Sequence, residues 1–384
     1  MSSTDTVLLQ PPWAPKPEKP EEPVEPWFRT AYKWKREQIF DWMKEMAAAG
    51  GDTPEEKEAR VLLTAIHERL AQLSLPAGSL FKDKTRRPDS HISRNVNLDW
   101  KREDETQSRF NVSPMSFSQI VKTFTGPVPD WWCPYDLIGL FLSLLGPAPS
   151  TATKYNFYLP LTAVYGRWCA RIAGKPERSW KWKPDHKGEG TLPNVFQCTW
   201  SLEVDDKTKQ HWGKYFLGAS TAGDRWEWKI TEKNPKSPTY TGAWRQRVEE
   251  ARFNMLFRCQ KIGMVKESAY RDKSAPSQTD ANGTMTPYGN CAETYPFIMI
   301  FSSSMSGLAL QKHFLGDAEW ADYTAVRDTA IWKNLMAPCL NCQVLITQAK
   351  ATLSKFDIET GQGTPPKPPT PELVPEARVL SVEA

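Results

Sequence analysis

Two short cysteine motifs place the strongest constraint on how this chain can fold. The first is Cys-Ala-Glu at residues 291–293, and the second is Pro-Cys-Leu-Asn-Cys at residues 338–342. With seven cysteines in 384 residues, chance gives about 0.1 Cys-x-x-Cys per chain, and a preceding proline lowers this to about 0.01. Cys-x-Glu is far commoner by chance, so the second motif carries most of the weight. Together they offer the thiolates of Cys291, Cys339 and Cys342 to a metal ion, with the carboxylate of Glu293 beside it.

The spacing of the second motif predicts its local structure. Cys339 and Cys342 are three residues apart, which places both on one face at the start of a helix, and Pro338 fits just before such a helix. Unpaired backbone amides and the positive end of the helix dipole favour thiolates there. Three protein ligands leave a fourth position on zinc open for water. Glu293 is then placed to take a proton from this water and pass it to a leaving nitrogen.

The same cysteines allow two other interpretations. A fourth ligand such as Cys259 or His313 would close the site into a structural zinc knot without catalysis. A redox-active Cys-x-x-Cys pair is the second possibility, although no βα unit precedes it in the sequence. The cysteines at 133, 169 and 198 have apolar neighbours and are predicted to lie in the core.

Charge and hydropathy favour an intracellular protein, cytoplasmic or nuclear, without a membrane partner. The formal net charge is +4, from 49 Lys and Arg against 45 Asp and Glu, which is too small an excess to imply a nucleic-acid partner on its own. The longest apolar run, residues 137–145, is too short to span a bilayer, and the amino terminus lacks the pattern of a secretory signal. An odd number of cysteines without such a signal favours reduced thiols.

The chain is expected to have four parts. Residues 1–27 and 361–384 are proline-rich tails that are predicted to be disordered, because they bury little apolar surface. Helical patterns dominate residues 28–174. Strand-like alternation and frequent Gly, Pro and Trp begin at Lys175, so we place a boundary near Gly174 and a zinc domain over residues 175–360.

Hydrophobic periodicity predicts individual elements of a mixed α/β fold. Thr53 can cap a helix that starts at Pro54, with a buried stripe of leucine and isoleucine side chains. Further helices are predicted over 32–46, 117–124, 136–145, 158–172 and 244–259, and strands over 196–204 and 226–230. The stripe after Pro54 consists of Leu63, Ile66, Leu70 and Leu73, and the charged face of the 244–259 helix consists of Arg245, Arg247, Glu249 and Glu250.

The two motifs together resemble the zinc signature of the cytidine deaminase-like superfamily, in its three-cysteine form. The matched segment covers about residues 280 to 350. The resemblance implies a three-layer α/β/α domain with a mixed sheet, which a mainly helical region precedes here. It also implies that Cys291, Cys339 and Cys342 are zinc ligands and that Glu293 is the proton shuttle.

The resemblance further implies substrate-binding residues near the first motif. The backbone amide at Ala292 would contact a carbonyl of the substrate, Asn282 would hold a sugar, and Tyr288 would flank the base. Asn282 followed by Gly283 is also a common turn sequence, and Tyr288 could simply be packing. Pro296 cannot donate a backbone hydrogen bond, so a helix at this motif must kink there or start after Cys291.

By this resemblance the protein is a zinc-dependent hydrolytic deaminase that acts on a cytosine-like or adenine-like base. The substrate would be a free nucleoside or nucleotide, or a single-stranded nucleic acid. Residues 180–183, Trp-Lys-Trp-Lys, could stack on bases and neutralise phosphates, or could form a surface strand with both rings packed inward. The competing hypothesis is a non-catalytic zinc-stabilised binding protein whose helices, tryptophans and tails recruit partners.

Overall fold

The computed structural model of the chain describes residues 25–49, 54–73, 115–116, 130–131, 134–149, 151–173, 193–204, 211–221, 249, 252–253, 256, 288–311 and 331–356. Several predicted features lie outside these residues: Asn282, the 117–124 helix, the 226–230 strand, the Trp-Lys segment at 180–183, and the carboxyl-terminal tail. The described part combines helices with a small antiparallel sheet, so the fold is mixed α/β.

Most of the described residues between 25 and 173 are helical, apart from two short strands at 115–116 and 130–131. The helices are α1 (Glu25–Lys33), α2 (Arg36–Ala48), α3 (Pro54–Leu73), α5 (Pro134–Ser143) and α6 (Leu159–Ala173), and a π-helical turn η2 (Lys154–Tyr158) leads into α6. The single helix expected over 32–46 is two helices, and α1 begins inside the range assigned to the first tail. Leu63, Ile66 and Leu70 of the predicted stripe are buried. None of the described helices is both long and apolar enough to cross a membrane.

Four tryptophans join α1 and α2 to α6. Trp27, Trp34, Trp42 and Trp168 contact one another pairwise, with ring centroids 5.3 to 6.4 Å apart. The indole nitrogen of the fully buried Trp168 donates to the Ala31 carbonyl at 2.8 Å, which satisfies its one polar group. This part of the tryptophan-rich composition therefore serves the packing of helices.

The main sheet has the strand order β4–β3–β5–β6, and all of its pairings are antiparallel. Its strands are β3 (Val195–Val204), β4 (His211–Ala219), β5 (Ser306–Gln311) and β6 (Leu335–Met336), and a separate two-stranded ribbon pairs β1 (Met115–Ser116) with β2 (Asp130–Trp131). The strand predicted at 196–204 is confirmed as β3, whereas β4 was not predicted. The parallel pairs that a mixed sheet requires are not among the described strands.

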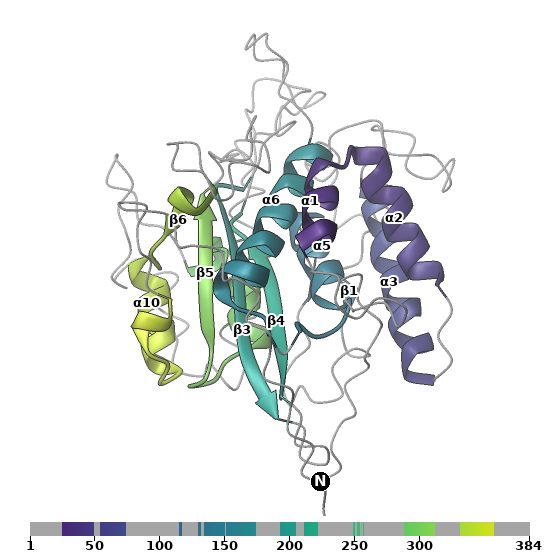
Figure 1. Cartoon of the computed structure of the whole chain (residues 1–384). Helices are drawn as coiled ribbons and strands as arrows, with labels where there is room; N and C mark the ends of the chain where they lie inside the picture. The colour runs from purple at the N-terminus through teal and green to yellow at the C-terminus, as the bar shows by residue number, and fades with distance from the viewer. Residues whose placement is uncertain are drawn as a thin grey trace, which may run out of the picture.

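Helices cover both faces of this sheet. On one face Tyr165 of α6 packs on Phe196, with ring centroids 5.4 Å apart, and Figure 1 shows α6 in front of the strands. On the other face Pro296 of α9 (Thr294–Met299) lies against β4, and Phe356 lies over Gly307 of β5. Because both faces are covered, consecutive residues of β3 are buried from Phe196 to Thr199.

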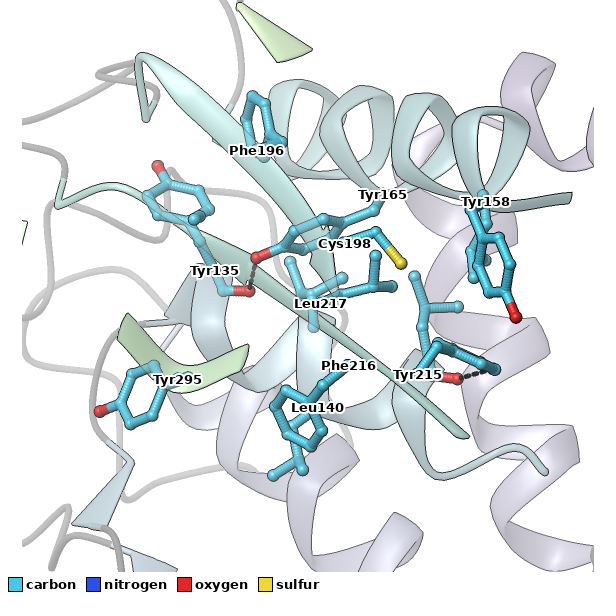
Figure 2. Packing of buried hydrophobic residues seen from close by; sticks show 14 of the residues in the cluster. Tyr135, Leu140, Tyr158, Tyr165, Phe196, Cys198, Tyr215, Phe216, Leu217 and Tyr295 are labelled. Carbon is cyan, nitrogen blue, oxygen red and sulfur yellow. Dashed lines mark hydrogen bonds between the residues drawn. The ribbon is translucent and has the colours of Figure 1, made fainter. Parts of the chain in front are cut away.

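Helix α5 covers the outer edge of β4. The Leu217 amide donates to the Ser143 hydroxyl at 3.0 Å, and the Tyr215 hydroxyl donates to the Leu142 carbonyl at 2.8 Å. Figure 2 shows the latter bond and the bond from the Tyr165 hydroxyl to the Tyr135 carbonyl, which is 2.9 Å long. A helix over the edge of a strand shields it from pairing with another chain. One hydrophobic core contains residues from both sides of Gly174. The domain boundary near Gly174 stays a prediction.

Candidate metal centre

The second cysteine motif begins α10 (Leu340–Gln348) as its spacing predicts. Cys339 is the residue that caps the helix, and Cys342 is the third helical residue. The Gln343 amide donates to the Cys339 carbonyl at 2.9 Å, so the first helical turn is formed between the two cysteines. Both sulfurs consequently lie at the amino-terminal end of α10, which Figure 1 places beyond β5 and far from α1, α2 and α3.

The first motif lies between the short helix η5 (Tyr288–Asn290) and α9. Glu293 is the capping residue of α9, so the helix starts after Cys291, which is one of the two outcomes that Pro296 allows. Pro296 is the third helical residue, where a backbone N–H has no partner within the helix. The proline therefore costs no helical hydrogen bond, and the helix is not kinked by it.

The structure brings the three motif cysteines together. The sulfur of Cys339 lies 3.4 Å from that of Cys291 and 3.5 Å from that of Cys342, and all three sulfurs are within 4.8 Å of one another. In a tetrahedral zinc site the sulfurs are about 2.3 Å from the metal and hence about 3.8 Å apart. Three close cysteines with this spacing can bind a metal ion. Cys259 and His313, the alternative fourth ligands, lie outside the described residues.

The three cysteines differ in their electrostatics. Side-chain hydrogen bonds with Cys291 and Cys342, and then the backbone amides of Cys342 and Asn341, together lower the pKa of Cys339 to about 3 against the opposing effect of burial. Donation to the Cys339 sulfur raises the pKa of Cys291, and burial raises that of Cys342. The cluster without a metal therefore favours a thiolate at Cys339 alone. A dication would supply the charge that keeps the other two deprotonated.

Glu293 lies beside the cysteines in a buried position. Its exposed fraction is 6%. Burial, followed by the charge on Cys339, raises the pKa of Glu293 to about 7, while interactions with the Cys342 side chain and Arg252 act in the opposite direction. A cation at the sulfurs would lower this pKa again. The Glu293 carboxylate is thus within electrostatic range of Cys339 and Cys342.

Of the three predicted substrate-binding residues, two are described. Tyr288 is buried, and burial, followed by the charges of the nearby Cys342, Cys339 and Cys291, raises its pKa. Ala292 is buried in the turn of the first motif, with its carbonyl oxygen toward Gly218 of β4. Asn282 lies outside the described residues.

Gly218 allows the first motif to approach β4 closely. A Cβ atom at this position would collide with the Ala292 carbonyl oxygen and would lie 2.5 Å from Pro296 Cδ. We expect Gly218→Ala to lower the free energy of unfolding by about 1–3 kcal/mol, because backbone must move to admit the methyl group. Urea denaturation measures this change. The exposed Ser303→Ala serves as the control, and equal stabilities of Gly218→Ala and the wild type would contradict the close approach.

Sequence analysis missed a buried arginine behind Cys291. The guanidinium Nη2 of Arg252 donates to the carbonyls of Ala219 at 2.7 Å and Cys291 at 3.1 Å. The same nitrogen lies 3.7 Å from a carboxylate oxygen of Asp136, and the guanidinium carbon lies 5.0 Å from the centre of the Tyr295 ring. Arg252 and Asp136 are both fully buried.

One residue of the helix predicted over 244–259 was wrongly assigned to its solvent-exposed face. Glu249, assigned to its charged face, has an exposed fraction of 7% and accepts a hydrogen bond from the Thr221 hydroxyl at 3.0 Å. Glu249, Arg252, Phe253 and Leu256 are helical and all buried. Their spacing of three, four and seven residues marks one helix face. Glu249 and Arg252 lie at helical spacing from the apolar residues Phe253 and Leu256. This spacing was the signal that could have identified both as buried.

Comparisons with known proteins found no family model, no curated protein and no solved structure that matches this chain. The structure establishes the arrangement of one group of side chains. Cys291, Cys339 and Cys342 form a group able to bind a metal ion, and Glu293 and Tyr288 lie beside it.

Proposed function

We propose that this protein is a zinc-dependent hydrolytic deaminase that removes an amino group from a cytosine-like or adenine-like base. The observation that carries this proposal is the close group of Cys291, Cys339 and Cys342 with the buried carboxylate of Glu293 beside it. These residues resemble the signature of the cytidine deaminase-like superfamily. Helices on both faces of a small sheet are compatible with the three-layer α/β/α fold of that superfamily, which we include in the proposal.

Zinc is the metal that the donor set fits best. Thiolates are soft ligands that select zinc over magnesium or calcium, and the distances between the sulfurs suit a tetrahedral ion. When bound with an open fourth position, zinc would lower the pKa of a water molecule there and so supply a nucleophile. Three thiolates weaken this effect relative to neutral imidazoles, so the proton acceptor Glu293 would be needed beside the metal. Among the described residues, no fourth side chain is grouped with the three cysteines.

The chain's own residues would move protons and hold the base. Glu293 would accept a proton from the attacking water as a general base and deliver it to the leaving amino nitrogen as a general acid. Water adds to the amidine-like carbon, the carbon–nitrogen bond breaks, and ammonia leaves. Burial of Glu293 keeps bulk water from competing for this proton. The backbone amide of Ala292 and the ring of Tyr288 would orient the base.

The test combines metal analysis with a substrate panel. Elemental analysis of the purified protein should find about one zinc per chain. Ammonia release would then be measured with cytidine, adenosine, their monophosphates, and single-stranded DNA and RNA oligonucleotides, and release is expected from one of these classes. A zinc-loaded protein that releases no ammonia from any of them would support the alternative, a non-catalytic zinc-stabilised binding protein. A folded protein without zinc would overturn both.

A further inference from the structure

The carbonyl of Cys291 is anchored by three hydrogen bonds. It accepts hydrogen bonds from the Thr294 hydroxyl at 2.7 Å, from the Thr294 amide at 3.2 Å and from Arg252 at 3.1 Å. The two Thr294 bonds are local to the turn. Among the residues that the structure describes, Arg252 is the donor that ties this carbonyl to another part of the fold, because the same Nη2 atom also donates to Ala219 at the end of β4.

We propose that Arg252, held by Asp136 of α5, is a positioning residue that fixes Cys291 for metal binding; this inference rests on the metal site of the proposed function. The two hydrogens of one guanidinium nitrogen can serve the Ala219 and Cys291 carbonyls together. The direction of the Cys291 side chain follows from its backbone, so this link holds its sulfur 3.4 Å from that of Cys339. Partners behind the ligands of a metal commonly set its affinity in this way.

Asp136 offsets the free-energy cost of burying the charge of Arg252. A fully buried cation is costly unless an opposite charge and further polar contacts accompany it. Asp136 supplies that charge at 3.7 Å, and the face of Tyr295 lies on the guanidinium at 5.0 Å. Asp136 is in the first turn of α5, where a negative charge also suits the helix dipole. The helical amino-terminal region thereby contributes to the metal centre through α5.

A double variant separates positioning from general stability. Asp136→Asn alone removes the carboxylate that lies 3.7 Å from Arg252 and should lower the melting temperature of the metal-free protein. Asp136→Asn combined with Arg252→Met replaces the pair with neutral groups of similar size, and such replacements often preserve stability. We therefore expect the double variant to melt close to the wild type but to bind zinc at least about tenfold more weakly, as measured by competition with a chelator.

Cobalt(II) provides a second readout that stability alone does not change. The intensity of its thiolate charge-transfer absorption reports how many sulfurs bind, so the double variant should show a weaker band than the wild type. If the double variant does not fold, Arg252→Lys keeps a positive charge near Asp136, but its shorter side chain does not carry a nitrogen to the position of Nη2 between the two carbonyls. It should then bind zinc several-fold more weakly.

The possible failures are distinguishable. A folded double variant with the zinc affinity and cobalt band of the wild type would overturn the role of Arg252 and leave the proposed function standing. If the double variant does not fold, wild-type zinc affinity in Arg252→Lys would overturn that role. Zinc binding by the wild type without ammonia release would count against the deaminase, while the comparison of affinities would still test Arg252. A wild type that binds neither zinc nor cobalt would overturn both proposals.

Discussion

Glu293→Gln should slow ammonia release by about 10²–10⁴-fold while zinc per chain stays unchanged. The factor is the usual contribution of a positioned general acid and base, and the amide keeps the size of the carboxylate while losing its ability to exchange a proton. Zinc content should persist because the three sulfurs hold the metal without Glu293. Turnover with the best substrate of the panel and elemental analysis of the same samples check both parts.

Glu45→Gln is the matched control for this change. Glu45 is an exposed residue of α2, so the same replacement there should leave both turnover and zinc content as in the wild type. Wild-type turnover in Glu293→Gln would show that this carboxylate is not the proton shuttle. Loss of zinc together with turnover would instead assign Glu293 a role in metal binding.

Cys291→Ser should leave the protein with little zinc at concentrations that saturate the wild type. A serine hydroxyl stays protonated at neutral pH and does not replace a thiolate, so two cysteines from one helix turn would remain. A ligand that binds only the folded state at 100 times its dissociation constant stabilises that state by about 2.7 kcal/mol. The melting temperature of the variant should therefore no longer rise when zinc is added.

Cys169→Ala controls for the loss of a buried thiol elsewhere. Cys169 is a fully buried residue of α6 in the core cluster. Its replacement should lower stability modestly through the cavity that it leaves, yet zinc content and stabilisation by zinc should match the wild type. If Cys291→Ser retained the wild-type zinc content, Cys291 would not be a ligand, and the three-cysteine site would be wrong.

Local patterns in the sequence were sufficient for much of the secondary structure. Leu63, Ile66 and Leu70 recur at helical spacing and lie on the buried side of α3, and the strand expected from Phe196 is β3. β4 was missed because its residues from Gly213 to Ala219 lack exposed positions between the buried ones. A strand that is covered on both faces loses the alternation by which strands are recognised.

The sequence by itself identified the three motif cysteines as candidate metal ligands and Glu293 as the candidate proton shuttle. It also predicted that a helix starts at Cys339, as α10 does. Each of these predictions depends on residue types at short spacing. Only the tertiary structure placed the Cys291 sulfur 3.4 Å from that of Cys339 and put Arg252 and Asp136 behind Cys291. Those contacts join α5, β4 and the first motif, which are far apart along the chain. Periodicity within one segment reports which face is buried, but the partner that neutralises a buried charge is fixed only when the segments pack together.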